Sequence, residues 1–290
     1  MNPLLTKLPR ITGILLIASL GLLLFRAFSD VTPALIIGSI VMFACCLASA
    51  IHLLGGRATT RFVLIAVVLG WIAEELGATR GWIFGSYDYT NVLGPQIGAV
   101  PFVIPLMWFA LCYIAYVIAN LIVWQKPADA QPGQPTPLLQ EIIMSLLAAM
   151  IVTAYDLGAD PYMVFVLKAW IMAKKDGWWF GETLQGFVGW MSVSFTIIMI
   201  FRLSLRKLPP VPALPATRRD MVVPLFIYGG NMVFQAFLGS PVETRTIALF
   251  AMGIPLMTAL CGFVRWNHSA ADAVPATATA SEPAPVRRQA

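Results

Sequence analysis

The stretch WIAEELGATRGWIFGSYDYTNVLGPQIGAVPFVIP, residues 71–105, places carboxylates, an arginine, tyrosines and glycines between two strongly apolar segments. Its adjacent acids Glu74 and Glu75 stand at the end of one apolar segment, and Val100-Pro101 begins the next. Ionisable side chains are costly beside a bilayer, so such a group favours a functional site. The alternative is that these residues only end a helix at the water interface. On either interpretation the stretch predicts a polar loop between two spanning helices.

The rest of the chain has the composition of an integral membrane protein. Of its 290 residues, 59% are hydrophobic and 11% are charged, and the mean hydropathy is +0.79. Soluble domains carry about a quarter charged residues. The apolar runs predict an all-α polytopic bundle of about eight transmembrane helices. The expected spans are 11–28, 34–54, 61–76, 101–124, 140–156, 183–201, 221–238 and 246–265.

One membrane domain accounts for most of the chain. Residues 1–267 are predicted to form it, with the chemically distinctive part at 71–190. The Ala/Pro-rich segment 268–290 is predicted to be a disordered tail. Two connections, KPADAQPGQPTP at 126–137 and LPPVPALPA at 208–216, are too rich in proline to be helical, so they separate helices.

The charged, cysteine and histidine residues exclude several classes of protein. The net charge of +5 comes from Lys and Arg clusters at the ends of apolar runs, so it indicates membrane topology and no nucleic-acid partner. The cysteine and histidine residues that could bind a metal ion are few, and their spacing matches no metal-binding motif: Cys45, Cys46, Cys112, Cys261, His52 and His268. We therefore expect neither a disulfide framework, nor a metal site, nor a cofactor.

The segment PYMVFVLKAWIMA, residues 161–173, decides the topology. As a helix it would be about 20 Å long, against about 30 Å of hydrocarbon, so it is predicted to be re-entrant or interfacial. One side of the bundle then collects most basic residues: Lys7, Arg10, Arg57, Arg61, Lys126, Arg202, Arg206, Lys207, Arg218, Arg219 and Arg265. The positive-inside rule makes that side cytoplasmic. We expect both termini there, with the protein in the cell (inner) membrane.

This topology brings two distant polar segments to the same, non-cytoplasmic side. They are the loop 77–100 and the segment 157–182. Six of the fourteen acidic residues lie in or beside them: Glu74, Glu75, Asp88, Asp156, Asp160 and Glu182. The two segments also echo one another, because each follows an acid-Leu-Gly-Ala motif and contains a Gly-Trp-x-Phe-Gly block. We expect their polar groups to meet.

Carboxyl groups in such a place can supply both an acid and a base. At the edge of an apolar cavity a carboxyl group stays protonated, whereas one near Arg80 would stay ionised, and addition of water to a double bond needs one of each. Asp156 and Asp160 are four residues apart, which is one helical face. Because Pro161 biases Asp160 away from helical geometry, the pair is predicted to straddle a helix end. The alternative is that Asp160 caps a following helix.

Aromatic residues surround these acids. They are Trp71, Trp82, Tyr87, Tyr89, Trp108, Tyr155, Trp170, Trp178, Trp179, Phe180 and Trp190. An aromatic belt at the membrane interface would explain many of them. Ring faces also suit a long conjugated ligand and can stabilise a carbocation. In an extended loop Tyr87 and Tyr89 point the same way and Asp88 points the opposite way.

Two blocks of residues resemble a known family. The first is Glu75-x-Gly77, Gly81, Phe84-Gly85-x-Tyr87-x-Tyr89-Thr90-x-x-Leu93-Gly94-Pro95, Val100-Pro101 and Trp108. The second is Thr153-Ala154-Tyr155-Asp156-Leu157-x-x-Asp160-Pro161-x-Met163, Trp170, Phe180-Gly181 and Gly189-Trp190. In order and spacing they resemble the membrane carotenoid-biosynthesis family that includes carotenoid 1',2'-hydratases and bisanhydrobacterioruberin hydratase. The resemblance covers about 120 residues, from Trp71 to Trp190.

The resemblance implies a cofactor-independent hydro-lyase that adds water to the terminal double bond of an acyclic carotenoid ψ-end. The catalytic residues it suggests are Asp156, Asp160, Glu75 and Asp88. The residues expected to bind substrate are Tyr87, Tyr89, Trp82, Arg80, Trp108, Trp178, Phe180 and Glu182. The expected partners are a carotenoid or another long isoprenoid lipid, the membrane, and other enzymes of the carotenoid pathway.

The chain also departs from the family pattern. Arg80 stands where a threonine is usual, and Tyr155 where a tryptophan is usual. A Gly-Val/Ile-Pro block with a later asparagine is replaced by Gly181-Glu182-Thr183 with Gly186. Glu182 therefore inherits no role from the family, and the added acid and arginine indicate a changed end-group or a changed reaction.

Two other functions fit parts of the pattern. A prenyltransferase or carotenoid cyclase could use the Asp-x-x-x-Asp spacing, and a transferase would hold Mg²⁺ and a diphosphate there. Its phosphate ligands would have to be Arg80, Lys174 and Lys175. A small-molecule transporter would place acids at the bilayer midplane, whereas these acids stand at helix ends.

Overall fold

The computed structural model describes residues 3–29, 32–126, 136–174, 177–208 and 222–272. Most of the two proline-rich connections predicted at 126–137 and 208–216 lies outside these ranges, and so does the predicted tail beyond residue 272. The last helix continues to Asp272, so it extends into the segment predicted to be disordered from residue 268.

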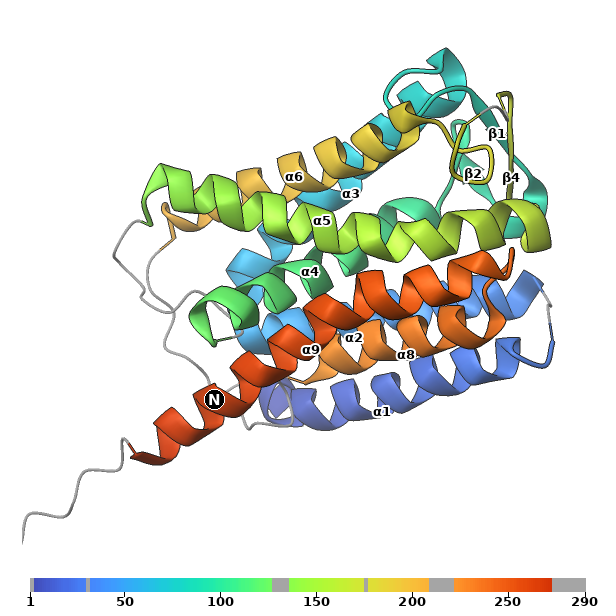
Figure 1. Ribbon diagram of the computed structural model, residues 1–290. Coiled ribbons are helices and arrows are strands. Elements are labelled where there is room, and N and C mark those ends of the chain that lie inside the picture. Colours follow the sequence, from blue (N-terminus) through green and yellow to red (C-terminus); the bar gives the residue numbers. More distant parts are fainter. Residues whose placement is uncertain (1–2, 30–31, 127–135, 175–176, 209–221, 273–290) are drawn as a thin grey trace, which may run out of the picture.

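Long helices make up nearly all of the described structure (Figure 1). They are α1 (Pro3–Arg26), α2 (Thr32–Leu54), α3 (Gly56–Arg80), α4 (Val103–Trp124), α5 (Leu138–Tyr162), α6 (Leu184–Leu205), α8 (Val223–Leu238) and α9 (Glu243–Asp272). Each of the eight predicted spans corresponds to one of these helices, with ends that differ by several residues. The helices lie side by side in one bundle.

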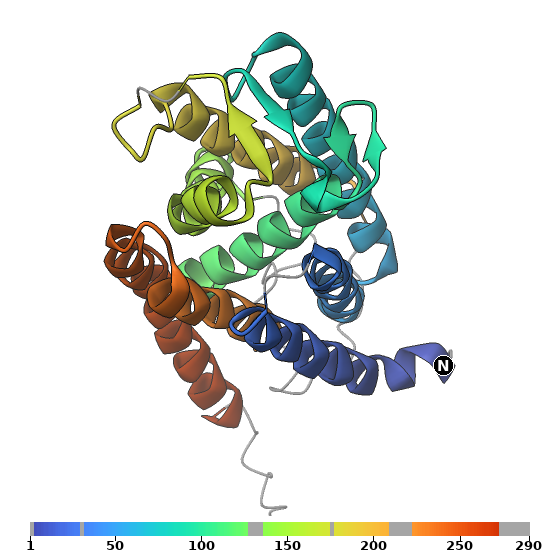
Figure 2. The same ribbon diagram turned by 90° about the vertical axis from the view of Figure 1, so that its right-hand side faces the viewer.

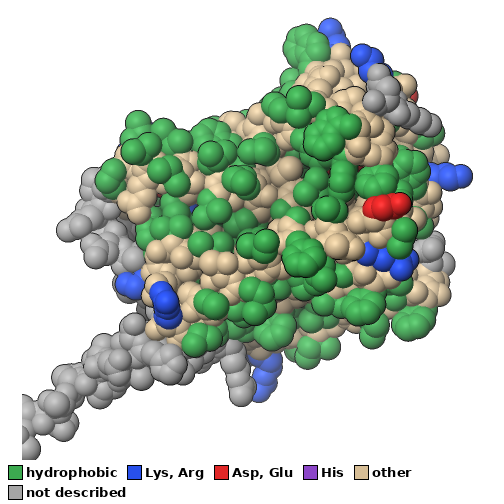
Figure 3. All heavy atoms as spheres, in the orientation of Figure 1, with side chains coloured by type: hydrophobic (Ala, Val, Ile, Leu, Met, Phe, Trp, Pro, Cys, Tyr) green, Lys and Arg blue, Asp and Glu red, His purple; other side chains and the backbone are tan. Residues whose placement is uncertain are grey.

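Seven of these helices are long and apolar enough to cross a membrane, within the part of the chain that is described. The exception, α8, has 16 residues. The outer face shown in Figure 3 is covered with hydrophobic side chains, and its Lys and Arg residues lie mostly toward the two ends. A broad apolar surface between charged ends suits lipid contact, so the all-α membrane bundle expected from the sequence is confirmed.

Helix α4 forms the centre of the bundle (Figure 2). It packs against α2, α3, α5 and α9, and nearly all of its side chains from Trp108 to Leu121 are buried. A helix that is apolar on every side is buried on every side, and the sequence of α4 has that pattern. Most of the remaining helices pack one face against α4, whereas α1 packs against α2 and α8.

Short strands close one end of the bundle, at the right of Figure 1. Strand β1 (Tyr87–Tyr89) pairs antiparallel with β4 (Trp170–Met172), with Asp88 opposite Ile171. A one-turn 3₁₀ helix η1 (Asn91–Leu93) and a hairpin of β2 (Gln96–Ile97) with β3 (Val100–Pro101) complete this end. The β1–β4 pair joins the loop 77–100 to the segment 157–182, so the predicted meeting of these segments is confirmed.

The segment 161–173 differs from the re-entrant or interfacial segment predicted. Pro161 and Tyr162 complete α5, the π-helical turn η2 (Met163–Leu167) extends it, and β4 follows. The segment stays at the strand-bearing end and does not cross the bundle, as expected, but it forms no separate helix.

The prediction that α5 would end near Asp160 is wrong, and so is the alternative in which Asp160 caps a new helix. Proline removes the backbone N–H that would bond the carbonyl four residues earlier, here that of Leu157. That carbonyl instead accepts the indole N–H of Trp179 at 3.0 Å. Because a side chain from outside the helix supplies the missing donor, α5 continues through Pro161.

A buried ion pair fastens the other end of the bundle. Arg202 on α6 lies 3.6 Å from Glu141 on α5 and donates a 2.5 Å hydrogen bond to Asn120 on α4. Its guanidinium also lies 4.6 Å from the ring centre of Tyr116. These contacts join three helices far from the strands.

Candidate active site

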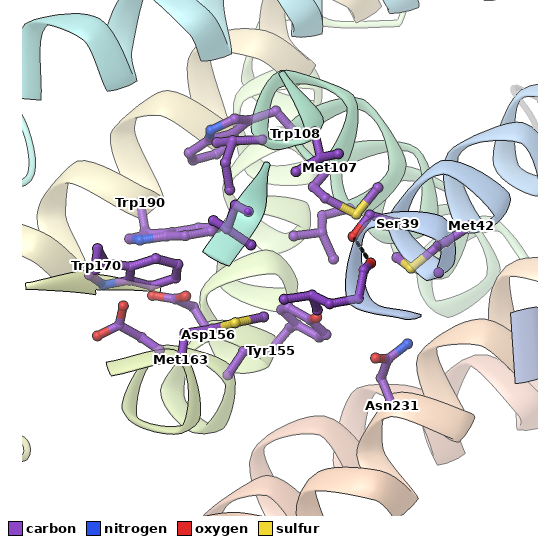
Figure 4. Close-up of a pocket in the computed structure, with 18 of the residues that line it drawn as sticks. Ser39, Met42, Met107, Trp108, Tyr155, Asp156, Met163, Trp170, Trp190 and Asn231 are labelled. Atoms are coloured by element: carbon purple, nitrogen blue, oxygen red, sulfur yellow. Dashed lines mark hydrogen bonds between the residues drawn. The ribbon is translucent and has the colours of Figure 1, made fainter. Parts of the chain in front are cut away.

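A cavity of about 150 Å³ lies at the strand-bearing end of the bundle (Figure 4). Its wall is mostly apolar and comes from seven of the long helices, all but α9, together with β1 and β4. In Figure 4, Trp170, Trp190 and Asp156 lie on one side of the open space, and Ser39, Met42 and Asn231 lie on the opposite side. The cavity therefore has an acidic, aromatic end and a second, weakly polar end.

Glu74 is the most completely hydrogen-bonded acid in the cavity wall. It is 4% exposed, and three donors converge on its carboxylate. Its Oε2 accepts from the hydroxyls of Tyr87 and Tyr89, the latter at 2.8 Å, and its Oε1 accepts from the indole of Trp108 at 2.9 Å. Burial and the charge of Glu74 raise the pKa of both phenols, so both keep their protons and remain donors. Glu74 therefore acts here as an acceptor.

Glycines on one face of α3 make this arrangement possible. Gly70, Glu74 and Gly77 are four and three residues apart and share a face. A Cβ atom on Gly70 would lie 2.6 Å from Cγ of Trp108, and one on Gly77 would lie 2.9 Å from the hydroxyl of Tyr87. The glycines thus allow the aromatic rings to pack directly against the helix backbone beside Glu74.

Asp156 and Asp160 share a face of α5, one turn apart, and both line the cavity. They are 2% and 6% exposed, respectively. Asp160 is hydrogen-bonded to Glu182 and to Trp170. Oδ2 of Asp156 has no hydrogen-bond partner among the described residues. One acid is therefore held by protein groups while the other keeps an oxygen available to a ligand.

Glu182 is the fourth acid of the cavity, and it lies outside the membrane-spanning segments. It precedes α6 and is 3% exposed. Burial, with the negative charges of Asp160 and Asp156 beside it, raises the pKa of Glu182 to about 11. Glu182 is thus protonated at neutral pH.

Aromatic rings cover these acids. Trp108 and Trp190 are stacked with ring centres 4.6 Å apart, and Phe84 stacks on Trp108 at 6.1 Å. Trp170 meets Tyr89 edge to face at 5.9 Å. These ring–ring contacts hold the aromatic faces in place in the cavity wall.

The second end of the cavity carries a different set of polar groups. Ser39 and Asn231 line it, and Arg26 also lines the cavity. The guanidinium of Arg26 lies 5.8 Å and 5.2 Å from the ring centres of Tyr162 and Phe234. The amide of Asn231 donates to Ile227 within its own helix. Arg26 is the only Lys or Arg among the described residues that line the cavity.

The structure brings together half of the residues that the sequence suggested. Six of them line the cavity: Asp156, Asp160, Tyr87, Tyr89, Trp108 and Glu182. Tyr87 and Tyr89 point the same way and Asp88 is exposed, as the strand alternation predicts. The other six do not line it: Glu75, Asp88, Arg80, Trp82, Trp178 and Phe180.

These six have other surroundings. Glu75 accepts the N–H of Ala99 at 2.8 Å, so it holds the β2–β3 hairpin against α3. Asp88 and Arg80 are exposed. Trp82 and Trp178 are 59% and 75% exposed, which fits an interfacial belt. Phe180 packs edge to face on Trp179.

Sequence reasoning missed the role of Glu74. Adjacent helical residues point about 100° apart, so only one of Glu74 and Glu75 can face the cavity. The glycines at 70 and 77 were the available signal, because they mark the tightly packed face of α3. Among the described residues, no group of three or more His, Cys, Asp or Glu side chains is arranged to hold a metal ion.

Comparisons with known proteins agree with the resemblance seen in the motifs. The sequence profile of a family described as carotenoid biosynthesis protein matches residues 32–260. The bisanhydrobacterioruberin hydratase of Haloarcula japonica is 26% identical over 203 residues. That match covers 68% of this chain and 64% of the relative, which is less than two thirds of the relative's length. No solved structure matches the chain.

Proposed function

The chain belongs to the family of carotenoid biosynthesis proteins, and from that membership we propose that it is a carotenoid hydratase. It adds water to the terminal double bond of an acyclic carotenoid ψ-end and forms a tertiary alcohol. The observation that carries this proposal is the cluster of buried carboxyl groups against the aromatic wall of one cavity. The name of the Haloarcula japonica relative supports the same reaction.

The cavity has the groups that hydration of an alkene needs. A protonated carboxyl group gives its proton to the less substituted alkene carbon, and a tertiary cation forms on the other carbon. The ring faces of Trp170 and Trp190 stand beside Asp156 and stabilise that cation by cation–π attraction. A carboxylate then takes a proton from water as the water oxygen bonds to the cation. Asp156 and Asp160, which both line the cavity, belong to the acid and base set.

The cavity also suits one end of a long apolar molecule. It is mostly apolar and encloses about 150 Å³, so it receives an end-group while the remainder of an isoprenoid chain lies outside it. The surface around the bundle is apolar as well, and the substrate dissolves in the lipid that contacts this surface.

The alternative functions are less well supported by the cavity. A prenyltransferase needs cations around a diphosphate, but Arg80 and Lys174 are exposed and do not line the cavity, and Lys175 lies outside the described residues. A cyclase uses the same initial protonation and differs only in what captures the cation. Its product has the mass of the substrate.

The cellular setting follows from the same proposal. The clusters of Lys and Arg support a topology with both termini in the cytoplasm and the protein in the inner membrane. The cavity that would hold the carotenoid then lies at the non-cytoplasmic end of the bundle. The protein partners of the enzyme are other enzymes of the carotenoid pathway. Cysteine-accessibility labelling from each side of the membrane tests this orientation, and labelling of residue 3 from outside would reverse it.

Product analysis in a lycopene-accumulating bacterial strain tests the reaction. We expect a product heavier by one water, with its hydroxyl oxygen drawn from ¹⁸O-labelled water and with formation that survives EDTA. An isomer of unchanged mass would favour the cyclase, and dependence on a prenyl diphosphate and Mg²⁺ would favour the transferase. Unchanged lycopene beside membrane-inserted protein would reject all three enzymes.

Asp156→Asn tests the cavity itself. The amide is nearly isosteric but can neither give nor take the proton, so we expect product formation to fall by about 10²- to 10⁴-fold. The exposed Glu243 at the start of α9 supplies the control, because Glu243→Gln makes the same chemical change outside the cavity. Equal activity of Asp156→Asn and wild type would remove Asp156 from the mechanism.

A further inference from the structure

A tight hairpin holds Glu182, the acid to which the family resemblance assigns no role. Gly177 and Gly181 exchange two backbone hydrogen bonds of 3.2 Å and 3.1 Å, and the N–H of Glu182 donates to Trp179 at 2.9 Å. Phe180 and Gly181 both have positive φ, 50° and 88°, which closes the turn within a few residues. The hairpin thus fixes the backbone of Glu182.

The hairpin is docked on the acidic helix itself. The indole of Trp179 donates to the Leu157 carbonyl that Pro161 leaves without its helical partner. Leu157 lies between Asp156 and Asp160 in sequence, so the docking point is within the stretch that carries both acids. The proline, the freed carbonyl and the indole together set the position of Glu182 relative to α5.

Two glycines make room for Glu182, one beside its backbone and one beside its side chain. A Cβ atom on Gly177 would lie 1.8 Å from the backbone oxygen of Glu182, and one on Gly186 would lie 2.6 Å from its Oε1. Gly186 is in the first turn of α6. The carboxyl group therefore folds over a helix surface that has no side chain and reaches the cavity wall.

The carboxyl groups of Glu182 and Asp160 are hydrogen-bonded to each other. Two ionised carboxylates have no proton to share, so one member of the pair is protonated. The indole of Trp170, which can only donate, also bonds to Asp160, so Asp160 is the acceptor in both hydrogen bonds and Glu182 carries the shared proton. Oε2 of Glu182 has no hydrogen-bond partner among the described residues and is buried beside the cavity.

We propose that Glu182 is the catalytic proton donor of this site, with Asp160 as its hydrogen-bonded partner. The inference rests on the proposed hydratase function. The O–H bond of Glu182 breaks as its proton and the alkene π pair form a C–H bond. Water bonds to the resulting tertiary cation, and Asp156 takes the released proton. Its return to Glu182 restores both groups, so the sum is one alkene and one water to one alcohol.

The arrangement explains why the chain carries an acid where its family pattern has none. A donor on the hairpin leaves the two aspartates of α5 free to remain bases, so donor and acceptor come from different elements. Glu74, saturated by three donors, cannot take the donor role.

Glu182→Gln is the sharpest test. Glutamine has the same shape and still donates a hydrogen bond to Asp160, so the site keeps its structure but loses the transferable proton. We expect product formation to fall by about 10²- to 10⁴-fold while the protein still inserts and elutes as a folded species. Glu243→Gln is the matched control and should keep wild-type activity. Activity of Glu182→Gln within about threefold of wild type would overturn the donor role and leave the hydratase intact.

An infrared spectrum of the purified protein tests the inference without any turnover. At neutral pH we expect the C=O stretching band of a protonated carboxyl group that disappears in Glu182→Gln and persists in Glu243→Gln. If that band is unchanged in Glu182→Gln, the proposal is wrong whatever the activity. If wild type carries the band but hydrates no acyclic carotenoid, the proposed function fails, and the donor role fails with it.

Discussion

Replacing Gly70 with alanine should damage the site through Trp108. The added Cβ would lie 2.6 Å from Cγ, 2.7 Å from Cδ1 and 2.8 Å from Cβ of that tryptophan. Ordinary carbon–carbon contacts are about 3.5–4.0 Å, so the ring must move by about 1 Å. It cannot simply rotate away, because the rings of Phe84 and Trp190 both pack against it and it is 2% exposed.

The expected energy follows from these contacts. Overpacking costs about 1–3 kcal/mol. A 1 Å shift also breaks the 2.9 Å bond from Trp108 to Glu74, and a hydrogen bond to a charged group contributes about 1.5–3 kcal/mol. Alanine recovers about 1 kcal/mol of helix propensity. We expect a net loss of about 2–4 kcal/mol in the free energy of unfolding, with a drop in hydration of about 10²-fold from misplacement.

The assay is thermal unfolding in detergent micelles, followed by circular dichroism, beside product formation per folded protein. Gly13→Ala is the control, since a Cβ on this glycine of α1 meets nothing within 4 Å. It should match or exceed wild-type stability and keep wild-type activity. If Gly70→Ala behaves like Gly13→Ala in both assays, the close packing of Trp108 on α3 is not what positions Glu74.

Two further predictions concern Arg202 and Glu182. Arg202→Met removes the buried partner of Glu141. The free energy of unfolding, measured by chemical denaturation, should fall by about 3–5 kcal/mol, while the rate of carotenoid hydration per folded molecule stays at the wild-type level. An unchanged free energy of unfolding would contradict the structural role of the pair. The pKa of Glu182 is raised from 4.5 to about 11. At a pH between these two values, the folded protein holds a proton that the unfolded chain has lost. The free energy of unfolding therefore falls as the pH rises, by at most about 1.4 kcal/mol per pH unit. Glu182→Gln removes this contribution, whereas the other acids of the cavity, Asp156, Asp160 and Glu74, are unchanged. The melting temperature of the variant should therefore vary less with pH than that of wild type between about pH 5 and about pH 10. Parallel curves for the two proteins would refute the raised pKa.

The overall architecture is readable in the sequence because it depends on a local quantity. Transfer of each apolar run from water to lipid is favourable by itself, whatever the rest of the chain does. The spans, and the meeting of the loop 77–100 with the segment 157–182, therefore follow from hydropathy and charge. The alternation of Tyr87, Asp88 and Tyr89 was also predictable, since it follows from strand geometry alone.

The composition of the site required the tertiary structure. Only the packing of Trp108 and Tyr87 on α3 shows that Glu74, and not Glu75, faces the cavity. Pro161 would end α5 in isolation, yet Trp179, which is 18 positions further along the chain, bonds the carbonyl that it frees. The same hairpin brings Glu182 to Asp160.

The physical reason for this division is the range of the interactions. Hydropathy and strand alternation act within a few residues, so the chain itself determined a membrane bundle with a polar end. Helix phase, a replaced hydrogen bond and the space left by a missing Cβ involve atoms from distant segments, and the tertiary structure alone decided which acids face one another.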